Sequence, residues 1–160
     1  MYQAMPLDIL LVDDNSVNLK VGKRILAMFG YTNVASATDG RMAIEAAEKH
    51  HFDLILMDLQ MPNLDGFTAH ERIKASPLAG YPCVVALTAN ADLVSAGRRS
   101  DIELISLQDT RQRCKLAGFF DYLSKPLVIP LLEKTIAAAF VYRQKDLDSR
   151  LATLRLEAAS

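Results

Sequence analysis

Three short blocks of mostly apolar residues, rich in branched side chains, stand out along the chain. They cover residues 7–12, 52–57 and 83–87. Near-continuous apolar runs of this length are typical of strands that are covered on both faces of a sheet. Two weaker runs, at residues 33–36 and 119–123, predict two further strands. The pattern therefore predicts a sheet of five strands.

The segments between these blocks have a helical pattern. Val17, Val21, Ile25 and Met28 are spaced four, four and three residues apart, so they share one face of a helix, and Gly30 is a natural stop for it. Further helices are predicted over residues 39–49, 66–75 and 108–117, and from Pro126 onward, since proline is tolerated at the first helical position. This alternation predicts an α/β fold with a parallel sheet, helices on both faces and right-handed crossovers.

One segment is longer than the alternation requires. Between Thr88 and Gly118 the chain has about a dozen residues more than a short loop and an average helix need. We place this insertion around residues 92–107, and interpret it as a surface excursion rather than a site.

The C-terminal residues continue the last helix. Leu147, Leu151, Leu154 and Ala158 fall at i, i+4, i+7 and i+11, which predicts a helix longer than 25 residues when joined to the segment before them. Such a tail could dock on the domain, link to a neighbouring domain or form a coiled coil. Phe140, Leu147 and Leu154 repeat every seven residues, but two heptad steps do not establish a coiled coil.

Composition argues against a nucleic-acid-binding, membrane-spanning or secreted protein. The chain has 160 residues, enough for one domain with extensions, and a net charge of −1 that gives no bulk attraction for nucleic acid. No apolar run approaches the roughly 20 residues that a membrane span needs, and the N-terminus lacks the pattern of a signal peptide. We therefore expect a cytoplasmic protein, or a domain cut from a longer one.

The cysteines and histidines carry no recognisable site pattern. Cys83 and Cys114 lie among apolar residues without a CxxC or Cys/His cluster, so we interpret both as reduced core thiols. His50, His51 and His70 are expected at the surface.

Acidic residues follow two of the predicted strands. Asp13 and Asp14 come directly after the first block, and Asp58 comes directly after the block at 52–57. The carboxyl ends of parallel strands meet at one edge of a sheet, so these three carboxylates are expected close together. Like charges at that spacing need a counter-ion, and Mg²⁺ fits because it takes carboxylates and leaves room for phosphate oxygens. The alternative is that Asp13 and Asp14 only cap the first helix, which Asn15 or Ser16 could do alone.

Two more residues fall at the same edge. Thr88 ends the fourth strand, and Lys125 follows the fifth. A hydroxyl group and an ammonium group there could bind phosphoryl oxygens. Each would be an ordinary residue if it stood alone, so it is their common position with the three acids that indicates a site.

These motifs resemble those of receiver domains in two-component response regulators, and most of all the receivers of hybrid histidine kinases. The matching stretches are residues 11–15, 57–66, 87–90 and 118–126, in this order, each at the end of a predicted strand. The likeness runs from about residue 7 to residue 140. It implies a doubly wound, flavodoxin-like sheet of order 2-1-3-4-5, with a receiver domain at residues 1–145 and a helical extension or linker at 146–160.

The resemblance also implies roles for individual residues. Asp58 would be the phosphoacceptor, taking a phosphoryl group from phosphohistidine in a phosphorelay. Asp14, Asp13 and the backbone carbonyl of Gln60 would hold Mg²⁺ together with Asp58, and Lys125 would pair with the phosphoryl group. The switch residues would be Thr88 and Tyr122, and Ala89 is small, as access to the aspartate requires.

Partners and rival functions follow from the same likeness. The likeness implies a histidine kinase or a histidine-phosphotransfer protein as partner, and the pattern of the C-terminal helix adds a homodimer as a further option. A phosphatase of the haloacid-dehalogenase type would need an Asp-x-Asp motif at the first strand, whereas Asp13 and Asp14 are adjacent. No glycine-rich nucleotide motif occurs, so we expect no turnover of an external substrate. The remaining alternative is a receiver fold that acts, without phosphorylation, as an interaction or dimerisation module.

Overall fold

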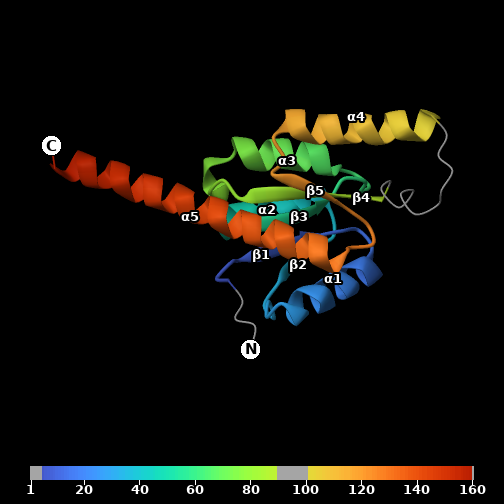
Figure 1. Ribbon diagram of the computed structural model, residues 1–160, viewed down its shortest axis with the longest axis horizontal. Coiled ribbons are helices and arrows are strands. Elements are labelled where there is room, and N and C mark those ends of the chain that lie inside the picture. The colour runs from blue at the N-terminus through green and yellow to red at the C-terminus, as the bar shows by residue number, and fades with distance from the viewer. Residues whose placement is uncertain (1–4, 90–100, 160) are drawn as a thin grey trace.

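The computed structural model describes residues 5–89 and 101–159, with only the backbone described over residues 101–108. In this part of the chain, five parallel strands form one sheet in the order β2-β1-β3-β4-β5 (Figure 1). The strands are β1 (Ile9–Val12), β2 (Ala35–Ala37), β3 (Leu54–Asp58), β4 (Cys83–Thr88) and β5 (Asp121–Ser124). Every adjacent pair is parallel. The predicted five-stranded α/β sheet and its order are confirmed.

Helices cover both faces of the sheet (Figure 1). They are α1 (Ser16–Met28), α2 (Gly40–Lys49), α3 (Gly66–Ala75), α4 (Asp101–Ala117) and α5 (Ile129–Ala159), with a 3₁₀ turn η1 (Pro77–Ala79). Side chains alternate between the faces along each strand. Leu10 and Ile55 pack with α2, α3 and the end of α4, whereas Leu11 and Leu56 pack with α1 and α5. The central strands are therefore buried on both sides, which explains their apolar sequences.

The face of α1 that contacts the sheet differs from the apolar stripe seen in the sequence. Leu19, Gly22 and Leu26 are buried, whereas Val17 and Met28 are 62% and 67% exposed. The helix carries two apolar faces, and only packing decides which one is covered. The predicted stop is confirmed, since Gly30 follows the helix with a φ of 93°.

Two helices begin at other residues than predicted. α4 begins at Asp101 rather than at residue 108, because residues 101–107 contain no glycine or proline that would oppose a helix. The rest of the proposed insertion, residues 92–100, lies outside the described residues. α5 begins at Ile129, so Pro126 is not its first residue, and Pro130 occupies the first turn instead.

The last helix is 31 residues long. Its buried residues are Leu132, Thr135, Ile136 and Ala139, all in the N-terminal half, and Figure 1 shows the C-terminal part extending away from the sheet. The predicted long helix is confirmed. None of the helices in the described part of the chain combines the length and apolar composition that crossing a membrane requires.

Candidate functional site

The carboxyl ends of the strands bring the predicted site residues together. Asp13 directly follows β1, Asp58 is the last residue of β3, and Thr88 is the last residue of β4. Lys125 follows β5, and its backbone N–H donates a hydrogen bond to the Thr88 carbonyl at 2.9 Å. The Lys125–Pro126 peptide bond is cis.

Three carboxylates converge at this edge. One oxygen from each of Asp13, Asp14 and Asp58 can be chosen so that all three lie within 4.8 Å of one another. Asp13 and Asp58 are only 2% and 3% exposed, whereas Asp14 is exposed. Hard oxygen ligands at this spacing, with an open side toward solvent, match the preferences of Mg²⁺. The residues present therefore fit that ion.

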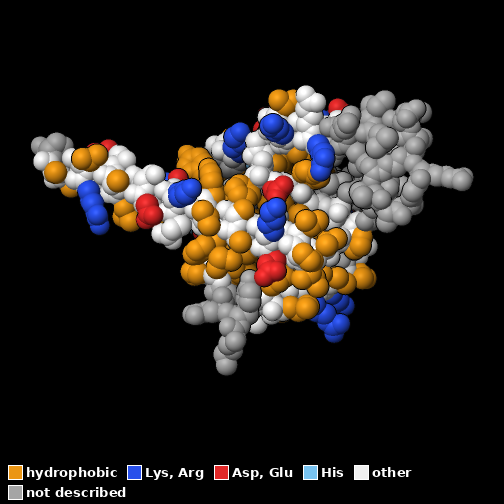
Figure 2. Space-filling view, viewed as in Figure 1, with side chains coloured by type: hydrophobic (Ala, Val, Ile, Leu, Met, Phe, Trp, Pro, Cys, Tyr) orange, Lys and Arg blue, Asp and Glu red, His pale blue; other side chains and the backbone are white. Residues whose placement is uncertain are grey.

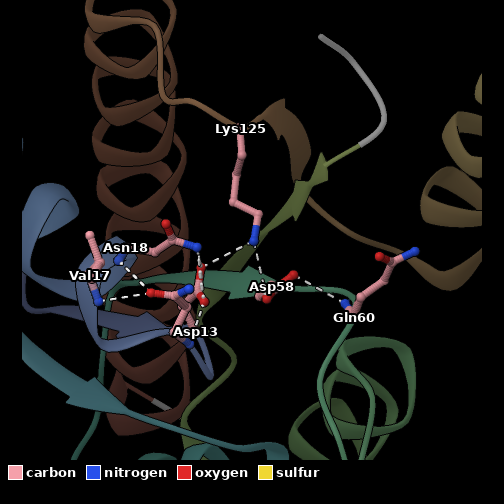
Figure 3. Close-up of polar contacts among 7 residues, drawn as sticks. Asp13, Val17, Asn18, Asp58, Gln60 and Lys125 are labelled. Atoms are coloured by element: carbon pink, nitrogen blue, oxygen red, sulfur yellow. Dashed lines mark hydrogen bonds and ion pairs between the residues drawn. The ribbon is translucent and has the colours of Figure 1, made fainter.

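A single ammonium group bridges the two buried acids. The Lys125 Nζ lies 3.2 Å from Asp13 Oδ2 and 3.2 Å from Asp58 Oδ2 (Figure 3). The Lys125 side chain is 20% exposed, so these ion pairs are largely shielded from water. The lysine thus holds the two strand ends together and places a positive charge beside Asp58.

Neighbouring groups fix the orientation of Asp13. The Asn15 backbone N–H donates to Asp13 Oδ1 at 2.8 Å. Asn18 Nδ2 donates to Asp13 Oδ2 at 3.1 Å (Figure 3). Asn15 itself caps α1, because its side-chain oxygen accepts from the backbone N–H groups of Val17 and Asn18. The two aspartates are therefore not needed as caps. The contribution of Asn18 was missed in the sequence, where only its place in the first turn of α1 pointed to it.

The chain after β3 holds Asp58 from the other side. The Gln60 backbone N–H donates to Asp58 Oδ1 at 3.1 Å, and the Gly66 N–H donates to the Leu59 carbonyl at 3.0 Å. A Cβ atom on Gly66 would overlap the Asp58 carbonyl oxygen and lie 2.8 Å from the Leu59 Cα. A glycine at this position lets the start of α3 approach the acidic residue directly.

The charge on Asp58 is not fully compensated. Burial raises the pKa of its carboxyl above the usual 3.8, although the Gln60 N–H and Lys125 both act in the opposite direction. Burial opposes the charged form of Lys125 as well, but Asp58 and Asp13 outweigh this effect and raise the pKa of the ammonium group. The lysine is therefore charged, and the site still has excess negative charge that a further cation would offset.

The predicted switch residues lie on β4, which pairs with the strand of Asp58, and on β5, one strand further along the sheet. Thr88 is 7% exposed, and with Gln60 and Ala89 it lines a cavity of about 220 Å³. Tyr122, on β5, is half-buried, and the Arg111 guanidinium lies 4.8 Å from the centre of its ring. The cavity thus adjoins Leu59 and Gln60, the two residues that follow Asp58, while the tyrosine ring lies against an arginine of α4.

The remaining candidates lie away from this edge. Cys83 and Cys114 are free and buried, as predicted, and burial raises the pKa of the Cys83 thiol to about 11. His50 and His51 are exposed, but His70 is only 4% exposed, so its predicted surface position was wrong. His70 packs at 4.1 Å, centre to centre, against the Phe119 ring, and Nε2 lies 3.0 Å from the Ala117 carbonyl oxygen.

Comparison with known proteins gives consistent matches. The family described as "Response regulator receiver domain" matches residues 9–107. A hybrid signal transduction histidine kinase H from Dictyostelium discoideum is 32% identical over 143 residues, which cover 88% of this chain. The sensor histidine kinase RcsC from Escherichia coli is also 32% identical, over 88% of this chain. The chain spans only 9% and 13% of the length of these two relatives.

Solved structures show the same fold. The receiver domain of the Pseudomonas aeruginosa sensor histidine kinase PA1611 is 35% identical, with a TM-score of 0.68. The match covers 85% of this chain and 98% of that structure, which is described as having a magnesium ion coordinated in its active-site cleft.

Proposed function

This chain belongs to the response regulator receiver domain family, and on that premise we propose that it accepts a phosphoryl group on Asp58 from a phosphohistidine donor. The observation that carries the proposal is the grouping of the Asp13, Asp14 and Asp58 carboxylates at one edge of the sheet, where the Lys125 ammonium group bridges Asp13 and Asp58. In the proposed step, a carboxylate oxygen of Asp58 attacks phosphorus. The P–N bond to the donor imidazole breaks, and its electron pair stays on the imidazole nitrogen.

The residues of this chain have distinct parts in the transfer. Asp58 is the nucleophile, and Lys125 stabilises the negative charge on the phosphoryl oxygens. Asp13, Asp14 and Asp58, with the Gln60 backbone carbonyl, would hold Mg²⁺, which would neutralise charge that the incoming group brings. The hydrogen bond from the Gln60 backbone N–H to Asp58 Oδ1 restrains the carboxylate. The Asp58 side chain therefore samples few rotamers before it attacks phosphorus. The chain modifies its own aspartate and turns over no external substrate.

Phosphorylation would then shift a conformational equilibrium. The phosphoryl group adds about 1.5 to 2 negative charges beside Thr88. Moving a two-state equilibrium from 1:99 to 99:1 needs roughly 5.5 kcal/mol of differential affinity. A charge-assisted hydrogen bond from Thr88 supplies about 1.5–3 kcal/mol, which is too little alone. We therefore assign the remainder to Lys125 and to repacking of Tyr122, which must leave the Arg111 guanidinium to turn inward.

The partners follow from the proposed chemistry. The relatives that this chain resembles are named as a hybrid signal transduction histidine kinase and a sensor histidine kinase. We propose a histidine kinase or a histidine-phosphotransfer protein as the donor or acceptor for this chain. The buried, free thiols of Cys83 and Cys114 are consistent with the cytoplasmic location that such a role implies.

The rival function is a receiver fold that serves as an interaction module without phosphorylation. The two functions differ in their response to small phosphodonors. The test is to expose the purified chain to acetyl phosphate, and separately to beryllofluoride, with Mg²⁺ and with Mg²⁺ removed by a chelator. We expect a phosphoryl adduct and a beryllofluoride complex only when Mg²⁺ is present. A chain that forms neither under any condition is an interaction module.

A further inference from the structure

The protruding part of α5 carries an ordered apolar stripe. Beyond Ala139, the last buried residue of the helix, about 20 residues continue for about 30 Å at 1.5 Å per residue. Leu147, Leu151 and Leu154 are 47%, 52% and 60% exposed. Figure 2 shows hydrophobic side chains on this part of the helix, which extends away from the body of the domain.

The stripe has the spacing of a coiled-coil seam. Its members alternate at three and four residues without a break, and they are Ala137, Phe140, Gln144, Leu147, Leu151, Leu154 and Ala158. This places Gln144 and Leu151 at a positions, and Phe140, Leu147 and Leu154 at d positions. Charged residues occupy the flanking e and g positions of the tail: Asp148 and Arg155 at e, and Arg150 and Glu157 at g. Three heptads thus have the composition of a helix that pairs with another helix.

The stripe does not coincide with the face that packs on the sheet. The domain-facing residues are Leu132, Thr135, Ile136 and Ala139, and the middle of the stripe lies roughly a quarter turn round the helix from them. Arg143 holds the helix from the domain side, donating to Asp53 Oδ1 at 3.2 Å and to the Tyr81 carbonyl at 3.1 Å. A second helix can therefore lie along the stripe while α5 stays in place on its own domain.

We propose that the stripe binds the same stripe of a second copy of this chain, forming a parallel two-stranded coiled coil. Gln144 favours this arrangement. In a parallel pair, a positions face each other, so the two Gln144 amides can hydrogen-bond across the seam. In an antiparallel pair each amide would face a leucine and keep only the hydrogen bond that its Nε2 donates to Asp148 Oδ1 at 3.4 Å, so the amide oxygen would be buried without a donor, which is costly. A polar residue at one a position also fixes the register of the pair.

Charge and length limit the strength of the dimer. Arg150 would approach Arg155 of the second copy, a repulsion that Asp146, 3.1 Å from Arg150 Nε, partly offsets. Three heptads give a short interface, so the dimer depends on chain concentration. The proposal is independent of phosphorylation, because the tail residues lie outside the carboxylate site.

Sedimentation equilibrium of the whole chain, over a wide range of concentration, tests the association. We expect a monomer–dimer equilibrium that Leu147→Asp or Leu154→Asp weakens by roughly 100-fold, since each change buries a charge in the seam. The matched control is Leu156→Asp, which alters a leucine of the same tail at an f position outside the stripe, and it should dimerise like the parent chain. A chain that stays monomeric, a larger assembly, or a dimer that both seam variants leave intact overturns the proposal.

A cysteine variant tests the orientation. Leu151→Cys places a thiol at an a position, where a parallel pair brings the two residues close enough for a disulfide. We expect oxidation to give a covalent dimer, with no competition from the buried Cys83 and Cys114. In the antiparallel arrangement position 151 faces position 147, so failure of Leu151→Cys to cross-link in a chain that still dimerises contradicts the parallel coiled coil.

Discussion

The Lys125 ammonium group lies 3.2 Å from Oδ2 of Asp58, and this ion pair joins the ends of β5 and β3 across the edge of the sheet. The same nitrogen also lies 3.2 Å from Asp13 Oδ2. Lys125 therefore compensates charge on two carboxylates that a metal ion would also bind. Under the proposed function, Lys125 would both assist phosphoryl transfer and compete with the metal ion for the carboxylates.

The first prediction separates these two effects of Lys125. In Lys125→Met, labelling of Asp58 by acetyl phosphate should slow at least about tenfold, because the phosphoryl oxygens lose a charge-assisted partner. The affinity for Mg²⁺ should increase, because the carboxylates lose their competing cation. Labelling kinetics and calorimetric Mg²⁺ titration measure the two quantities. The control is Lys145→Met, an exposed lysine of the tail, and an unchanged Mg²⁺ affinity in Lys125→Met contradicts the competition.

The second prediction concerns metal removal and pH. Mg²⁺ at about 100 times its dissociation constant should stabilise the fold by about 2.7 kcal/mol, and a chelator should abolish this gain. Burial raises the pKa of Asp58, and only the carboxylate form binds metal, so Mg²⁺ affinity should fall with decreasing pH sooner than for a carboxylate with the usual pKa of 3.8. Thermal unfolding with and without Mg²⁺ at a series of pH values measures the stabilisation by Mg²⁺ and its dependence on pH. In Asp14→Asn most of the gain should be lost, and a full gain in that variant excludes Asp14 as a ligand.

The third prediction tests the close contact at Gly66. A Cβ atom there would meet backbone atoms of Asp58 and Leu59, which cannot move without moving the site. Gly66→Ala should therefore lower the free energy of unfolding by about 1–3 kcal/mol and weaken Mg²⁺ binding. The comparison is Gly22→Ala, where the new Cβ would meet only the Leu11 side chain, at 2.7 Å, so that any loss of stability should leave Mg²⁺ binding unchanged. Chemical denaturation measures the stability of both variants, and Mg²⁺ titration measures their metal affinity. Equal Mg²⁺ affinity in the two variants would contradict the role of Gly66.

The fourth prediction follows from the buried His70. Burial lowers the pKa of this imidazole below its usual 6.5, so the folded protein takes up the proton at a lower pH than the unfolded chain does. Between pH 6.5 and the lower pKa of the folded state the unfolded chain holds more protons, and stability should fall as pH falls, by up to about 1.4 kcal/mol per pH unit. In His70→Gln this contribution should disappear, while the exposed His51→Gln should retain it. Chemical denaturation at a series of pH values measures the free energy of unfolding. If its slope against pH is equal in the two variants, His70 does not titrate in this way.

The strands and the acidic edge were predictable because their signals are local. Each central strand is a run of apolar residues that ends at a polar one, and the parallel order then brings Asp13, Asp58 and Thr88 together. The buried face of α1 was not predictable, since Val17, Val21 and Met28 form as good a stripe as Leu19 and Leu26 do. Only the packing of Leu26 against the sheet distinguishes them.

Other details depend on distant partners that no local pattern reveals. The burial of His70 depends on Phe119 and on the end of α4, which lie far along the chain. Asn18 orients Asp13 only because the first turn of α1 folds back over the end of β1. The sequence likewise does not show that α5 starts at Ile129, because Pro126 and Pro130 both suit a first helical turn.

Phosphotransfer from a radiolabelled phosphohistidine protein is the most direct test of the proposed function. The parent chain, Asp58→Asn and the distant Asp148→Asn would be incubated with the donor and Mg²⁺, and each variant would be checked for an unchanged fold by circular dichroism. We expect label on the parent chain and on Asp148→Asn, and none on Asp58→Asn. Equal labelling of folded Asp58→Asn, or no labelling of the parent chain by any phosphohistidine donor, would contradict the account.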